Sequence, residues 1–179
     1  MTDVLTIPTP EAMAALGAAI ADRVTAGDLV MLNGELGAGK TTLTRGLGEA
    51  LGVRGAVTSP TFVLARTHPR ENGAPLVHVD AYRLRSAVEL DDLDLDFENS
   101  IVVVEWGDGL LDGITDSWLR VDIERPHGGD VSDLDGTDLD GTDFDRTDEG
   151  GTDEEQPRTV SITGVGPRWE GVSWNAPGH

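Results

Sequence analysis

The sequence of 179 residues has no cysteine, a single lysine (Lys40) and few aromatic residues. Without cysteine, disulfide bonds and thiolate metal sites are excluded. No apolar run approaches the length of a membrane span. The first residues carry neither a basic cluster nor a long apolar run, so no signal peptide is expected. These absences predict a cytoplasmic protein that does not enter a membrane. A chain of this length is expected to form one domain with a substantial core.

Positive charge is also scarce, since 13 Lys and Arg residues are set against 33 Asp and Glu residues, a net charge of −20. Residues 126–157 alone contain nine Asp, three Glu and one Arg, a net charge of −11, which leaves −9 for the rest of the chain. An acidic surface argues against unaided binding to the phosphate backbone of a nucleic acid. Nucleic acid held mainly by a partner protein stays compatible with this charge.

The acidic stretch repeats with a period of five residues. Leu-Asp-Gly-Thr-Asp occupies 134–138 and 139–143, and Phe-Asp-Arg-Thr-Asp follows at 144–148. Few apolar residues and a high like charge predict a disordered insertion in a hairpin loop at about 126–157. Calcium binding is the alternative, but the spacing lacks the glycine at the sixth position and the glutamate at the twelfth position of the twelve-residue calcium loop.

The segment from Gly34 to Thr41 matches the phosphate-binding pattern G-x-x-x-x-G-K-[ST] at every fixed position. Glycines allow the backbone to curl and turn its N–H groups toward an anion. Lys40 supplies a positive charge for the β and γ phosphates, and Thr41 supplies a hydroxyl for Mg²⁺. An apolar strand at 28–33 before the loop and a helical pattern ending at Gly52 after it favour this interpretation over an ordinary glycine-rich turn.

The other predicted elements fit the same architecture. A helix is expected to begin at Thr9-Pro10-Glu11 and to end at Gly27, and Ser86 with Glu89 forms a capping box for a short helix. The remaining patterns predict strands at 63–66, 76–80 and 101–105 and two antiparallel strands at 119–123 and 159–163. The fold class is therefore α/β of the P-loop NTPase type. It has a mostly parallel central sheet flanked by helices and an antiparallel C-terminal hairpin.

Carboxylates end two of the predicted strands. Glu105 follows an apolar strand at the sheet edge where open α/β sheets place their ligands. We interpret it as a second Mg²⁺ anchor beside Thr41, in preference to a solvated residue at a strand exit. Asp80 either orients water or binds a metal-bound water. His78 shares the face of Asp80, and a structural histidine is its simpler interpretation.

Three further features leave alternatives open. The hydroxyl-rich segment 58–62 is either a loop that senses the γ-phosphate or an ordinary turn. Trp106 could stack on a ligand, cover the site or pack into the core. Arg83 could contact phosphate or pair with Asp80.

Taken together and in order, four segments resemble the bacterial ATPase family TsaE of tRNA threonylcarbamoyladenosine (t6A) synthesis. These are Gly34-Glu35-Leu36-Gly37-Ala38-Gly39-Lys40-Thr41-Thr42, Thr58-Ser59-Pro60-Thr61-Phe62, His78-Val79-Asp80-Ala81-Tyr82-Arg83 and Val104-Glu105-Trp106-Gly107-Asp108. Many families share the first segment, whereas the other three in this order are far more specific. The resemblance covers nearly all of the chain except roughly 126–157, from which no residue role is carried over.

The resemblance implies a small ATPase that binds ATP with Mg²⁺ and supports a complex with two partners, TsaB and TsaD. TsaD would transfer the threonylcarbamoyl group to tRNA, so this chain would touch tRNA only indirectly. By the family pattern Lys40 contacts phosphate, Thr41 and Glu105 serve Mg²⁺, and Asp80 is needed for hydrolysis. The remaining implied nucleotide contacts are the loop residues Glu35, Leu36, Gly37, Ala38, Gly39 and Thr42, then Thr61 in a switch-like loop, Trp106, and Thr9, which matches a position near the adenine only loosely.

Three rival functions stay open. A small-molecule kinase shares the phosphate loop but usually adds an arginine-rich lid, and the region after Glu105 is acidic instead. A GTP-dependent switch lacks support because no Asn-Lys-x-Asp segment is present. A nucleotide-dependent interaction module with negligible turnover is the third. Because no arginine finger is evident within the predicted site, we expect hydrolysis by the chain alone to be weak.

Overall fold

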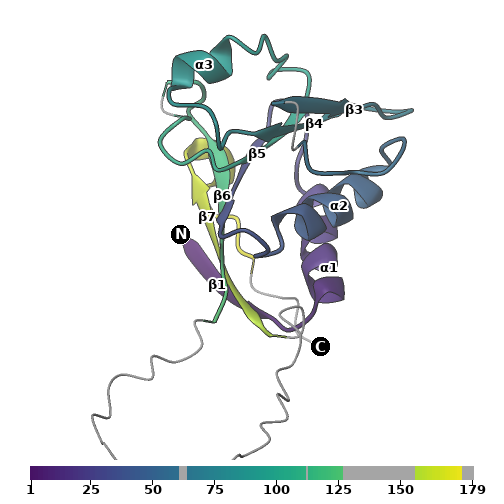
Figure 1. Ribbon diagram of the computed structural model, residues 1–179, viewed down its shortest axis with the longest axis vertical. Helices are drawn as coiled ribbons and strands as arrows, with labels where there is room; N and C mark the ends of the chain where they lie inside the picture. The colour runs from purple at the N-terminus through teal and green to yellow at the C-terminus, as the bar shows by residue number, and fades with distance from the viewer. Residues whose placement is uncertain (61–63, 112, 127–155, 175–179) are drawn as a thin grey trace, which may run out of the picture.

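A seven-stranded mixed sheet organises the chain in a computed structural model that describes residues 1–60, 64–111, 113–126 and 156–174 (Figure 1). The strand order is β1-β7-β6-β2-β5-β4-β3. The strands are β1 (Thr2–Ile7), β2 (Leu29–Gly34), β3 (Ala65–His68), β4 (Leu76–Asp80), β5 (Ile101–Glu105), β6 (Trp118–Glu124) and β7 (Arg158–Val165). The helices are α1 (Pro10–Ala21), α2 (Lys40–Leu51) and α3 (Ala87–Asp91), with a 3-10 turn at Pro167–Trp169.

The four central strands β6, β2, β5 and β4 are parallel, and the outer strands run antiparallel to their neighbours. All five residues of β5 are buried, as expected for a central parallel strand. β6 and β7 form the predicted antiparallel pair on either side of residues 127–155. The P-loop type of α/β fold predicted from the sequence is therefore confirmed. The acidic repeats, with their predicted disorder and alternative calcium binding, lie outside the described residues.

Helices α1 and α2 lie side by side on one face of the sheet and cover the larger of two apolar clusters (Figure 1). Their backbones approach closely where Gly17 faces α2 and Gly46 faces α1. A Cβ built on Gly17 would overlap the Leu43 carbonyl oxygen and lie 2.7 Å from the Leu47 nitrogen, and one built on Gly46 would overlap the Ala14 carbonyl oxygen. The crossing therefore requires a residue without a side chain on each helix.

Replacing Gly17 by alanine is expected to destabilise the fold by about 1–3 kcal/mol, the usual range for overpacking a filled core. The added methyl group meets backbone atoms of α2, which cannot rotate away as a side chain would. Urea denaturation of the wild type and the variant measures the difference. Alanine is a better helix former than glycine by about 1 kcal/mol. An unchanged or raised stability would therefore show that the helices can separate.

The opposite face of the sheet is covered by α3 and irregular chain over β4 and β5, around a second apolar cluster that includes Leu90, Leu110 and Leu111. The predicted cap of α3 forms only in part. Ser86 Oγ accepts a bond from the Glu89 backbone N–H (3.4 Å), but the Glu89 carboxylate accepts from the backbone N–H of Arg85 (2.6 Å). None of the helices in the described ranges is long and apolar enough to cross a bilayer.

Two predicted elements had wrong boundaries, and one strand was not predicted. Helix α1 ends at Ala21 and not at Gly27, because Val24 is buried from the turn that follows the helix. The strand predicted at 63–66 is β3 at Ala65–His68. Strand β1 was not predicted, since its Asp3 is buried and its Val4 is 62% exposed, the reverse of the usual pattern. The buried Asp3 carboxylate accepts a bond from the Trp174 backbone N–H at 2.6 Å.

Candidate functional site

The phosphate-loop motif forms the connection between β2 and α2. Gly39 stands at the N-cap of α2 with φ of 116°, a left-handed conformation that glycine adopts without strain. A Cβ at this position would lie 3.3 Å from the Met13 Cε on α1. The loop therefore needs glycine here both for its turn and for its contact with the neighbouring helix.

Lys40 is held at the first position of α2 and is only 5% exposed. Its Nζ donates to the carbonyl oxygens of Gly34 (2.7 Å) and Glu35 (2.9 Å). Burial lowers the pKa of the Lys40 ammonium, while the nearby carboxylates of Glu105 and Asp80 act in the opposite direction. The Lys40 ammonium is thus a buried cation directed into the loop, where it would attract a bound anion.

Trp106 covers this cation. The Lys40 Nζ lies 4.1 Å from the centroid of the indole ring, and Tyr82 meets that ring edge-on at 5.5 Å. Trp106 has φ of 63°, and its backbone N–H donates to the Leu32 carbonyl oxygen at 3.0 Å. A bulky residue in the left-handed region stores about 1–3 kcal/mol of strain, and such residues cluster at functional sites. Of the three roles open to Trp106, covering the site agrees with this placement.

The two predicted carboxylates meet at the same edge of the sheet, because Asp80 and Glu105 are register partners on the parallel strands β4 and β5. Glu105 is 4% exposed and its Oε1 lies 2.7 Å from the Nε2 of His78. Asp80 is half-buried, and its Oδ1 accepts a bond from the Tyr82 backbone N–H at 3.1 Å. Each carboxylate therefore has one oxygen engaged by the protein.

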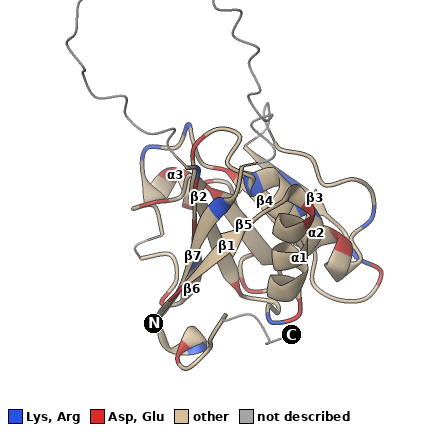
Figure 2. Cartoon of the chain, turned by 90° about the horizontal axis from the view of Figure 1, so that it is seen from below, with Lys and Arg blue, Asp and Glu red and all other residues tan. Residues whose placement is uncertain are grey.

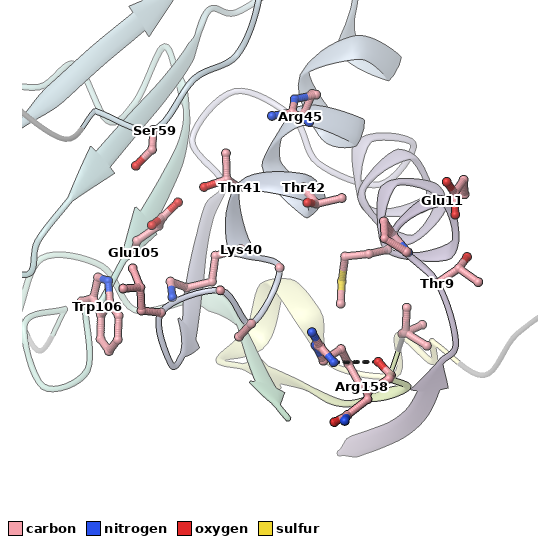
Figure 3. Close-up of a pocket in the computed structure, with 18 of the residues that line it drawn as sticks. Thr9, Glu11, Lys40, Thr41, Thr42, Arg45, Ser59, Glu105, Trp106 and Arg158 are labelled. Atoms are coloured by element: carbon pink, nitrogen blue, oxygen red, sulfur yellow. Dashed lines mark hydrogen bonds between the residues drawn. The ribbon is translucent and has the colours of Figure 1, made fainter. Parts of the chain in front are cut away.

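These residues line one pocket of about 610 Å³ (Figure 3), within the size range of small-molecule sites. Figure 3 shows Glu105 and Trp106 on one side of Lys40 and Thr41, and Thr9 on the other. Of the residues predicted to bind ATP, metal or water, the lining includes Thr9, Leu36, Gly37, Ala38, Gly39, Lys40, Thr41, Thr42, Asp80, Glu105 and Trp106.

The other predictions are placed differently. Glu35 contributes its carbonyl oxygen to Lys40, but its side chain is not part of the pocket lining. Ser59 lines the pocket and brings the hydroxyl-rich segment to it, whereas Thr61 lies outside the described residues. Arg83 is exposed, and within the described part of the chain it makes neither an ion pair with Asp80 nor a contact with the pocket.

Sequence reasoning missed two arginines that line the pocket. Arg45 of α2 and Arg158 of β7 both line the pocket. Arg158 is 9% exposed, and its Nη1 donates to the Gln156 carbonyl oxygen at 2.6 Å. Its position follows from the pairing of Arg158 with Ile7 of β1, the strand that was not predicted. Met13 of α1 also lines the pocket.

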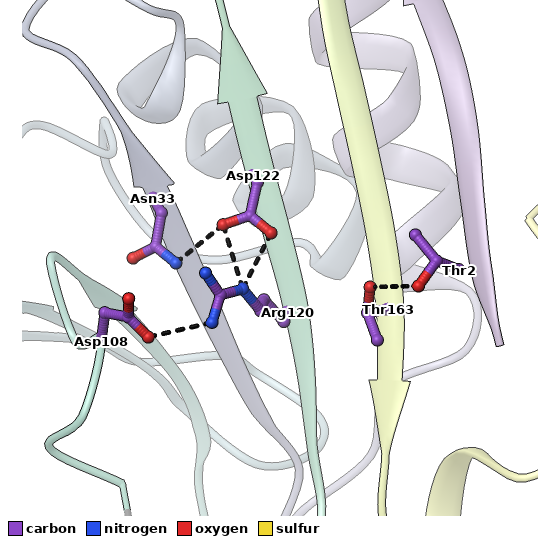
Figure 4. A network of polar contacts seen from close by, with 6 residues as sticks. All are labelled: Thr2, Asn33, Asp108, Arg120, Asp122 and Thr163. Atoms are coloured by element: carbon purple, nitrogen blue, oxygen red, sulfur yellow. Dashed lines mark hydrogen bonds and ion pairs between the residues drawn. The ribbon is translucent and has the colours of Figure 1, made fainter.

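A polar network supports the loop on the side of the sheet away from α1 and α2 (Figure 4). Asn33, just before the phosphate loop, donates to Asp122 at 2.9 Å. Arg120 bridges Asp122 (2.8 Å) and Asp108 (2.9 Å), and the hydrogen bond to Asp122 is the main cause that raises the pKa of the Arg120 guanidinium. The network thus ties the exit of β2 to the segment that follows Trp106.

The donor set fits a magnesium ion bound together with phosphate. The Thr41 hydroxyl and the Glu105 carboxylate both line the pocket, and hard oxygen ligands are those that Mg²⁺ prefers. Mg²⁺ is usually bound by one or two protein oxygens plus phosphates and water. Among the described residues, no group of three His, Asp or Glu side chains is placed to hold a metal alone.

Comparison with known proteins gives one family. The family model described as "Threonylcarbamoyl adenosine biosynthesis protein TsaE" matches residues 7–130, more than half of the chain. A protein of Streptomyces coelicolor named "tRNA threonylcarbamoyladenosine biosynthesis protein TsaE" is 52% identical over 161 residues, covering 88% of this chain and 93% of its own length. Proteins with the same name from Mycobacterium tuberculosis and Bacillus subtilis are 50% and 35% identical over 67% and 65% of this chain.

A solved structure has the same architecture. The crystal structure of YdiB from Bacillus subtilis superposes with a TM-score of 0.66 at 26% sequence identity, covering 95% of this chain and 90% of that one. The similarity therefore extends over the sheet, including β6 and β7, the two strands that flank residues 127–155.

Proposed function

Because the chain belongs to the TsaE family of threonylcarbamoyl adenosine biosynthesis proteins, we propose that it is a Mg²⁺-dependent ATPase that assists t6A modification of tRNA together with TsaB and TsaD. In this proposal the chain is an accessory component and not the transferase. The observation that carries it is the pocket in which the phosphate loop, two carboxylates and Trp106 converge. Phosphate-loop residues without these carboxylates would support nucleotide binding alone.

The phosphates would lie against the loop. Backbone N–H groups from Gly37 to Thr42 and the first turn of α2 favour an anion, through their orientation and through the helix dipole. Lys40 would exchange its bonds to the loop carbonyls for the β and γ phosphates. The base would lie toward the start of α1, near Thr9, which lies on the side of Lys40 away from Glu105 and Trp106 (Figure 3).

The metal would be held by Thr41 and Glu105. A magnesium ion held there would supply positive charge to offset the negative charge that develops during phosphoryl transfer. One oxygen of Asp80 accepts the bond from the Tyr82 backbone N–H, and because Asp80 lines the pocket, its carboxylate would orient the attacking water. Trp106 would exclude bulk water from the phosphates, which strengthens the electrostatic contacts within the site.

Contact with tRNA would be indirect. The chain carries a net charge of −20, and in the view of Figure 2 the Lys and Arg residues are interspersed with Asp and Glu. A protein that binds RNA by itself usually presents a basic stripe. We therefore propose that the partners hold the RNA, in the cytoplasm, while this chain supplies the nucleotide cycle.

Hydrolysis by the purified chain is expected to be weak and to rise when TsaB and TsaD are both present. In the isolated chain the Lys40 cation is bonded to carbonyl oxygens of its own loop and lies under Trp106. A partner that moves Trp106 and the loop would free Lys40 to contact the phosphates. Release of phosphate from ATP is measured for the chain alone, with each partner and with both. Fast turnover by the chain alone, or no response to both partners together, would contradict the proposal.

A further inference from the structure

A buried histidine, His78, contacts the carboxylate of Glu105, which we propose as a metal ligand. His78 of β4 is 0% exposed, and its Nε2 lies 2.7 Å from the Glu105 Oε1. A carboxylate only accepts hydrogen bonds, so the imidazole must donate from Nε2. This bond occupies Oε1. In the described part of the chain Oε2 has no hydrogen bond, and Glu105 lines the pocket.

The pair lies among apolar side chains. Leu76 of β4 and Ile101 and Val103 of β5, which project to the same face of the sheet as His78 and Glu105, are all at most 1% exposed. Moving a carboxylate and an imidazole out of water is costly, and an apolar pair of similar size is often at least as stable. The second ring nitrogen of His78, Nδ1, is buried with no partner among the described residues. Fold stability alone therefore gives a weak reason for a histidine at this position.

Geometry gives a stronger reason. A free glutamate rotates about three side-chain bonds, so its carboxylate would not keep one orientation at the mouth of a strand. A hydrogen bond from a residue locked in the neighbouring strand removes this freedom. Partners of this kind, which hold a metal ligand without touching the metal, commonly set the affinity of the ion.

We infer that His78 is a positioning residue for the ion bound by Thr41 and Glu105. By holding Oε1, it turns Oε2 toward the ion and limits how far the carboxylate can swing. This inference rests on the proposed function, because it concerns the ion that accompanies ATP. The site itself is described above, and His78 has no direct contact with nucleotide, because it does not line the pocket.

The test compares ATP affinity with Mg²⁺ and with EDTA, measured by calorimetry, for the wild type, His78→Leu and His78→Gln. Leucine removes the donor, and the glutamine amide nitrogen stands near the place of Nε2. His78→Leu is expected to lose about 10–100-fold of the Mg²⁺-dependent gain in affinity while its affinity in EDTA is unchanged. His78→Gln is expected to keep most of the gain.

His68→Leu is the matched control. His68 is a buried histidine on β3, 5% exposed and with an unpartnered Nε2, and it has no bond to Glu105. It is expected to bind ATP and Mg²⁺ as the wild type does. Should His78→Leu fail to fold, His78→Asn replaces it, because the shorter amide stays in the strand but does not reach Oε1.

Two results would overturn the inference alone. One is an unchanged Mg²⁺-dependent gain in His78→Leu, and the other is an equal loss with and without Mg²⁺, which indicates a general structural role. A wild-type protein that binds ATP equally well with Mg²⁺ and with EDTA would overturn the proposed function as well. The two failures are therefore distinguishable.

Discussion

Replacing Lys40 by alanine is expected to lower kcat/KM for ATP by about 10²–10³-fold, the usual loss when one pre-oriented charge donor is removed from a transition state. Lys40 is the only lysine of the chain, is 5% exposed and already points into the loop. Arg45, further along α2, and Arg158 of β7 also line the pocket, but neither stands at the end of the phosphate loop as Lys40 does, and we expect neither to replace it. The measurement is steady-state phosphate release in the presence of TsaB and TsaD.

Arg54→Ala is the control for loss of one positive charge. Its guanidinium is exposed on the surface, where it pairs with Glu71 at 2.9 Å. It is expected to retain wild-type turnover, and the thermal unfolding midpoint of each variant establishes that the protein is folded. If Lys40→Ala kept its turnover within a factor of two of the wild type, the phosphate loop would have no role in the proposed hydrolysis of ATP.

The second large effect is expected for Glu105→Gln, which should lower Mg²⁺-dependent turnover by about 10²–10³-fold while ATP still binds. The amide keeps the size of the side chain but removes the negative charge that would hold the ion beside Thr41. In EDTA the affinity for ATP is expected to be unchanged or higher, because a carboxylate facing the phosphates is gone. Turnover and equilibrium binding, each with and without Mg²⁺, separate the two effects.

Glu124→Gln provides a closely matched control. Glu124 also ends a parallel strand of the same sheet, but it is exposed and is not part of the pocket lining. The same chemical change there is expected to leave turnover and Mg²⁺ dependence as in the wild type. If Glu105→Gln and Glu124→Gln lost activity equally, the cause would be the overall negative charge at the sheet edge and not a metal ligand at one position.

The parts of the fold that could be predicted are those with a strong local pattern. Strands β4 and β5 were predicted with their observed bounds, and α2 ends before Gly52 as expected, because an apolar run or helical spacing marks each of them. Strand β1 carries no such pattern. Its buried Asp3 is tolerated only because the Trp174 backbone N–H, from the other end of the chain, satisfies it.

As with the fold, the parts of the site that could be predicted are those that a local sequence pattern marks. Gly37 to Thr42, Asp80, Glu105 and Trp106 line the pocket, because a local pattern defines the phosphate loop and the ends of the strands, whereas the roles assigned to these residues stay predictions. The contact between His78 and Glu105 depends on the register of two strands that are 20 residues apart in sequence, and the position of Arg158 depends on the strand order. Neither long-range arrangement is encoded in a local pattern. The roles of Thr61 and of residues 126–157 stay predictions.

The glycine contact between α1 and α2 has a mechanical consequence for nucleotide sensing. With Gly17 against the backbone of α2 and Gly46 against that of α1, the two helices cannot slide or tilt without overlap. Residues of the first turns of both helices line the pocket, so in the proposed function these helices would hold the two ends of the nucleotide at a fixed separation. The opposite wall, with Asp80, Glu105 and Trp106, stands at the ends of β4 and β5, where hydrogen bonds hold Glu105 and Trp106 in place of a contact between helix backbones. A difference between ATP and ADP would therefore be transmitted by that wall, and a partner that distinguishes the two would bind there.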